Sequence, residues 1–78
     1  MSIDEFIEEI EIILELDNFK LDKAFNLRDL DEYDSLSILA IISTIKEKFN
    51  IKLNIKQFSN VYTINDLINL IGIDAFNE

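Results

Sequence analysis

The chain contains no cysteine, histidine or proline, and its 78 residues include a single glycine. Without cysteine it can form neither disulfides nor thiolate metal sites, so a hydrophobic core must hold the fold. Without thiol or imidazole groups it is poorly equipped for catalysis on its own. The scarcity of proline and glycine favours helices over a turn-rich β architecture. The composition therefore predicts a helical protein that is not an enzyme, with no catalytic residues and no metal.

Long apolar segments are also absent. The longest uninterrupted apolar run, Ile38 to Ile42, is far too short to cross a bilayer. No basic region precedes an apolar stretch, as a secretory signal would require. The length suits one domain, close to the smallest size that folds without disulfides or a structural metal. We therefore expect a single domain over residues 1–78, monomeric and cytoplasmic.

Negative charge is concentrated in the first part of the chain. The net charge is −9, and residues 1–34 hold twelve acidic side chains against three basic ones, whereas residues 35–78 hold four of each. A surface of this sign repels phosphate backbones and anionic lipids, so we expect neither nucleic-acid nor membrane binding. Basic protein partners are plausible, although solubility alone accounts for most acidic surfaces.

Apolar side chains recur at helical spacing in several segments. The first predicted helix begins with a capping box of Ser2 and Glu5, and Thr63 and Gly72 flank the last one. After Gly72, Ile73 and Phe76 could still dock, but we expect the terminus to fray. Short helices in so small a chain must pack around one core, so the predicted fold is an all-α antiparallel bundle with a long first loop. The predicted helices are three main ones at residues 3–16, 35–49 and 64–71 and a short one at 55–60.

The segment between the first two helices, residues 17–34, carries no sustained period. A loop of this length in a small domain is usually functional or contains a helical turn. Its apolar residues recur every two to four positions, which predicts that the loop packs against the core. These residues are Phe19, Leu21, Phe25, Leu27 and Leu30.

A spacing of about 100° per residue divides the second predicted helix into two faces. The core face holds Ile38, Ile41, Ile42, Ile45 and Phe49, with Leu39 at its edge. The opposite face holds Leu36, Ser37, Ala40, Ser43, Thr44 and Glu47. Leu36 is thus an apolar residue on a face that packing does not need.

Asp34, Ser35 and Leu36 stand at the entry to this helix. A serine here is most simply an N-cap whose hydroxyl accepts a backbone hydrogen bond. Asp34 is itself a good N-cap, however, and would leave the Ser35 hydroxyl free at the first helical position. A helix N-terminus stabilises an attached phosphate through its unpaired N–H groups and its dipole. The residues thus fit a serine that bears a phosphodiester, but they do not identify what the phosphate carries.

With these features in this order, the chain resembles an acyl carrier protein over nearly its whole length. The segment from Leu30 to Leu36, which contains Asp-Ser-Leu, and the segment from Ile45 to Phe49 are similar to the family signature. Asp-Ser-Leu alone is a weak motif. Its position in a chain of this length and helix order makes it specific.

The resemblance implies that Ser35 receives phosphopantetheine from coenzyme A through a phosphopantetheinyl transferase. The thiol of this arm would hold acyl or aminoacyl groups as thioesters and deliver them to loading and transferring enzymes of fatty-acid (lipid) or specialised biosynthesis. It also implies that Asp34 and Leu36 contact the transferase and partner enzymes, and we place Ser37 and Ala40 on the same partner-binding surface. Fatty acyl, polyketide and amino acid cargoes all remain open.

The chain departs from the usual family pattern in two respects. Fatty-acid carriers usually have acids on the second helix at the positions of Ser37, Ala40, Lys46 and Lys48, and they usually have glycine where this chain has Tyr33. These departures favour a dedicated pathway carrier over the general fatty-acid carrier, and apolar docking over docking by charge. Transferase binding should then respond weakly to salt, whereas a steep response would assign recognition to acids of the first helix and loop.

Two other functions have less support from the sequence. An unmodified helical adaptor would bind basic partners through its acidic surface, with Ser35 serving only as a cap. An enzyme would need the loop acids Asp29, Asp31, Glu32 and Asp34 to gather around a divalent cation, but their spacing lacks the central glycine and terminal glutamate of an EF-hand calcium loop. We therefore predict no metal site there.

Overall fold

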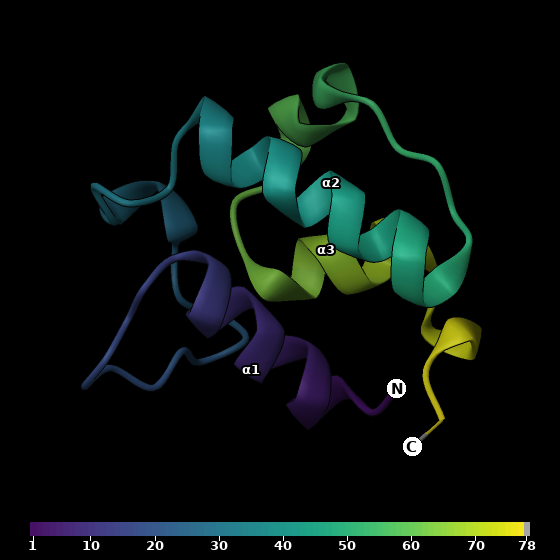
Figure 1. Cartoon of the computed structure of the whole chain (residues 1–78), viewed down its shortest axis with the longest axis horizontal. Helices are drawn as coiled ribbons and strands as arrows, with labels where there is room; N and C mark the ends of the chain where they lie inside the picture. The colour runs from purple at the N-terminus through teal and green to yellow at the C-terminus, as the bar shows by residue number, and fades with distance from the viewer. Residues whose placement is uncertain (78) are drawn as a thin grey trace.

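Three α-helices and three short 3-10 helices follow one another along the chain. The computed structural model describes residues 1–77, and within this range there is no β-strand. α1 runs in the opposite direction to α2 and α3 (Figure 1). The predicted all-α bundle with a long first loop is confirmed. The helices are α1 (Ile3–Ile13), η1 (Leu27–Asp29), α2 (Ser35–Phe49), η2 (Ile55–Asn60), α3 (Ile64–Ile71) and η3 (Ile73–Ala75).

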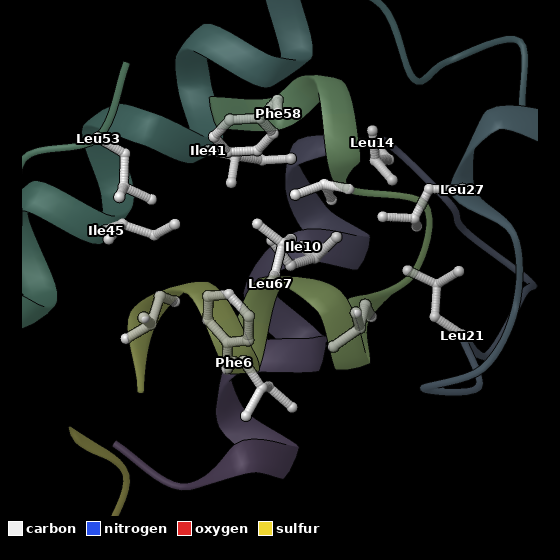
Figure 2. Packing of buried hydrophobic residues seen from close by; sticks show 14 of the residues in the cluster. Phe6, Ile10, Leu14, Leu21, Leu27, Ile41, Ile45, Leu53, Phe58 and Leu67 are labelled. Atoms are coloured by element: carbon white, nitrogen blue, oxygen red, sulfur yellow. The ribbon is translucent and has the colours of Figure 1, made fainter. Parts of the chain in front are cut away.

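A single hydrophobic core joins these helices. Phe6 and Ile10 of α1, Ile41 and Ile45 of α2, and Leu67 of α3 are all fully buried. Figure 2 shows side chains from the helices and the first loop pointing into the same interior. Through this core α1 and α2 are held in contact with each other.

The predicted capping box at the start of α1 and the predicted N-cap of α3 both form. The Ser2 hydroxyl accepts a hydrogen bond from the backbone nitrogen of Glu5 at 3.1 Å, and the Glu5 carboxylate accepts one from the backbone nitrogen of Ser2 at 2.8 Å. At the start of α3, the Thr63 hydroxyl accepts a hydrogen bond from the backbone nitrogen of Asp66 at 3.2 Å. These bonds satisfy donors that a helix start would otherwise leave unpaired, and they fix both boundaries.

The long first loop is packed against the core, as predicted. Leu21 and Leu27 are buried, and Phe25 and Leu30 are half-buried against the core. Phe19 is the exception, because it is 40% exposed; it forms an edge-to-face pair with Phe25, with ring centroids 5.2 Å apart. The predicted helical turn within the loop is η1.

The end of α1 differs from the prediction. The helix ends at Ile13 rather than near residue 16, because Glu15 takes the left-handed backbone conformation with φ of 57°. The backbone nitrogen of Leu16 donates to the carbonyl of Glu11 at 3.0 Å, and that of Glu15 donates to the carbonyl of Ile12 at 3.1 Å. This pair of bonds is a Schellman motif, which usually places glycine where Glu15 stands.

After α3 the chain is folded onto the core as far as Phe76, so docking, which the sequence left open, occurs at Phe76 in place of the expected fraying. Gly72 has φ of 104°, a conformation that favours glycine, and it lets the chain turn back onto the core. Phe76 is buried there, with its ring centroid 5.4 Å from that of Phe6 and 5.0 Å from that of Phe49. Ile73, by contrast, is 58% exposed. Aromatic contact therefore fixes this segment.

Candidate functional site

The start of α2 is closed by a reciprocal pair of hydrogen bonds. The Asp34 carboxylate accepts one from the backbone nitrogen of Ser37 at 3.0 Å, and the Ser37 hydroxyl accepts one from the backbone nitrogen of Asp34 at 2.8 Å. Asp34 is therefore the N-cap, and Ser35 is the first helical residue. The predicted division of roles between these two neighbours is confirmed.

The Ser35 side chain is exposed, and its hydroxyl makes no hydrogen bond to any group within residues 1–77. It lies at the N-terminus of a helix of 15 residues. The first backbone N–H groups of such a helix have no intrahelical partner, and the helix dipole is positive there. A phosphodiester on this oxygen would be stabilised by both, and a long arm attached to it would extend into solvent.

Ser37 does not lie on the exposed face where the helical angle placed it. It is only 8% exposed, because its hydroxyl folds back onto the N-cap and donates to the backbone carbonyl of Asp34 at 2.9 Å. A short polar side chain in the first turn of a helix commonly bonds to the backbone in this way. The prediction of an outward-facing Ser37 is therefore wrong.

The other residues of the outer face of α2 that lie near Ser35 are exposed, as predicted. Leu36 is 78% exposed and Ala40 is also exposed, while Thr44, further along, is half-buried. Leu39, predicted at the edge of the core face, is 52% exposed. Leu36 and Leu39 thus give the start of α2 an apolar surface that no other part of residues 1–77 covers.

An open hollow of about 460 Å³ adjoins the serine. Asp34, Leu36, Ser37 and Ala40 all line it, so the structure brings together the four residues that the sequence analysis placed on one surface. Ser35 lies between two of them in the chain. The hollow is completed by residues that sequence reasoning did not associate with the site, namely Glu32 of the loop and Ile13, Leu14 and Glu15 from the end of α1.

Tyr33, which stands where the family usually has glycine, packs against the core just before the cap. Its phenol oxygen is buried and has no hydrogen-bond partner within residues 1–77. Burial raises the pKa of this phenol above its ordinary value of 10.0. The residue therefore fills space beside the site and keeps its hydroxyl protonated at neutral pH.

Two negative findings concern metals and membranes. Within residues 1–77, no three acidic side chains come together in an arrangement that suits a metal ion. Over the same range, none of the helices combines the length and the apolar character that a bilayer crossing requires.

The fold and the exposed serine at the start of α2 together define a small all-α domain of the carrier type. Comparison with protein families matches residues 4–71 to the family described as phosphopantetheine attachment site. The match covers most of the chain, and the chain belongs to this family. It is a carrier domain of the acyl-carrier type rather than an enzyme, and phosphopantetheine is its covalent cofactor. No curated protein and no solved structure matches the chain.

Proposed function

We propose that Ser35 is the residue that carries the phosphopantetheine arm. The observation behind this choice is a comparison of the five serines. Ser2 and Ser37 use their hydroxyls within helix caps. Ser43 lies in the middle of α2, where backbone N–H groups are already paired along the helix, and Ser59 lies within η2. Only Ser35 combines a free, exposed hydroxyl with the N-terminus of an α-helix.

The attachment step requires little of the chain itself. The Ser35 oxygen forms a bond to the phosphorus on the pantetheine side of coenzyme A. The pyrophosphate bridge breaks, and the nucleotide half leaves with the bridging oxygen. The serine proton passes to a base of the transferase or to solvent. When attached, the arm supplies the thiol that the sequence lacks, and with it the capacity to hold acyl or aminoacyl groups.

The chain's own contribution is to position and present this oxygen. Asp34 holds the helix start, so that the Ser35 hydroxyl is not consumed by the cap. Leu36 and Ala40 offer an exposed apolar surface directly beside it. We propose that the transferase and the later loading and transferring enzymes contact this surface, and that the chain acts as a monomeric carrier in the cytoplasm.

The absence of acidic side chains at certain positions of α2 is the basis for a proposal about the pathway that this carrier serves. Its surface has no acid at Ala40, Lys46 or Lys48, and the residue before the cap is Tyr33. We propose that this carrier serves a dedicated biosynthetic pathway rather than general fatty-acid synthesis. Mass spectrometry of the protein purified from its native host tests this directly. Ordinary saturated fatty acyl groups as the main cargo would contradict it.

The attachment site is tested by incubating the purified chain with coenzyme A and a broad-specificity phosphopantetheinyl transferase. Intact mass should increase by one phosphopantetheine per chain. Ser35→Ala should abolish the increase. The matched control is Ser43→Ala, which removes another exposed hydroxyl of α2 and should leave the modification unchanged. An unchanged mass increase in Ser35→Ala would refute the assignment.

A further inference from the structure

We draw no further inference here: the strongest candidate, the buried phenol oxygen of Tyr33 beside the cap of α2, has no hydrogen-bond partner within residues 1–77, but its ring packs against the core and nothing in the structure shows which group would reach it.

Discussion

The guanidinium carbon of Arg28 lies 4.0 Å from the centroid of the Tyr62 ring, so its charge stands over the aromatic face. The same guanidinium donates hydrogen bonds to the backbone carbonyls of Ser59 at 2.9 Å, Phe58 at 3.2 Å and Val61 at 3.1 Å. Arg28 therefore joins η1 to the last turn of η2. These contacts anchor the first loop, which leads on to Asp34, against the segment after α2.

Replacement of Arg28 by alanine should lower the free energy of unfolding by about 2 kcal/mol, because several charge-assisted hydrogen bonds are lost together. Arg28→Lys should recover only part of this loss, since an ammonium group cannot reproduce the planar fork of donors. Urea unfolding followed by circular dichroism measures both. Lys23→Ala, which removes an exposed positive charge from the same loop, should change stability by less than about 0.5 kcal/mol. An equal loss in Arg28→Ala and Lys23→Ala would show that net charge, not this contact, is responsible.

The capping geometry of α2 predicts that substitutions of the neighbouring residues Asp34 and Ser35 differ in their effect on stability. Asp34→Ala should cost about 1 kcal/mol of stability, because it removes the N-cap acceptor. Ser35→Ala should change stability by less than about 0.5 kcal/mol, since its hydroxyl takes part in no bond within the fold. Thermal and urea unfolding of the two variants test this. If Ser35→Ala were as destabilising as Asp34→Ala, the serine hydroxyl would be part of the cap and not free for modification.

The unpaired phenol of Tyr33 leads to a prediction that a substitution leaves stability unchanged or raises it. Tyr33→Phe removes a buried oxygen that has no partner within residues 1–77 and leaves the ring in place. Stability should therefore stay the same or rise by up to about 1 kcal/mol. Tyr62→Phe is the control, because that tyrosine is 46% exposed. A loss of about 1 kcal/mol in Tyr33→Phe alone would show that the phenol is hydrogen-bonded in solution.

Helix positions were predictable from the sequence where local rules agree. Apolar spacing and cap residues point to the same boundaries for α2 and α3, apolar residues alone indicated the turn at 55–60, and the structure has those boundaries. The end of α1 was missed because its apolar spacing continues to Leu16, while Glu15 breaks the helix through a conformation that glutamate seldom adopts. Docking of Phe76 was left open by the sequence for a different reason. It depends on aromatic contacts with Phe6 and Phe49, which lie far away in sequence.

For the candidate site, the sequence predicted the cap and the free serine but not their surroundings. Asp34 and Ser35 follow from local capping preferences, so a single segment contains the information. Ser37 was misplaced because helical angles ignore a side chain that bonds back to its own turn. Glu15 lies twenty residues before Ser35 in the chain and lines the hollow beside it only through the packing of α1 against α2. No local pattern reports such a contact.

Acid dependence of stability is expected from Asp66 at the start of α3. Its carboxylate accepts hydrogen bonds from the backbone nitrogens of Tyr62 at 2.8 Å and Thr63 at 3.1 Å, and these bonds lower the pKa of Asp66 below its ordinary value of 3.8. The folded state therefore binds this proton less readily than the unfolded chain. The resulting stability is present above pH 3.8 and is lost as the pH falls through the lower folded value.

Asp66→Asn removes the charge and keeps a side chain of the same shape, so it should be less stable than the unaltered chain at neutral pH. The difference in unfolding midpoint should shrink as the pH falls below 3.8 and through the lower folded pKa, because the aspartate then becomes protonated in the folded state as well. Comparing the two proteins at each pH is necessary, because acid also relieves the repulsion within a chain of net charge −9 and shifts both midpoints together. Asp31→Asn makes the same change in charge at an exposed position where the carboxylate accepts no hydrogen bond within residues 1–77. If its midpoint followed the same pH dependence as that of Asp66→Asn, overall charge rather than the bonds to Asp66 would explain the acid response.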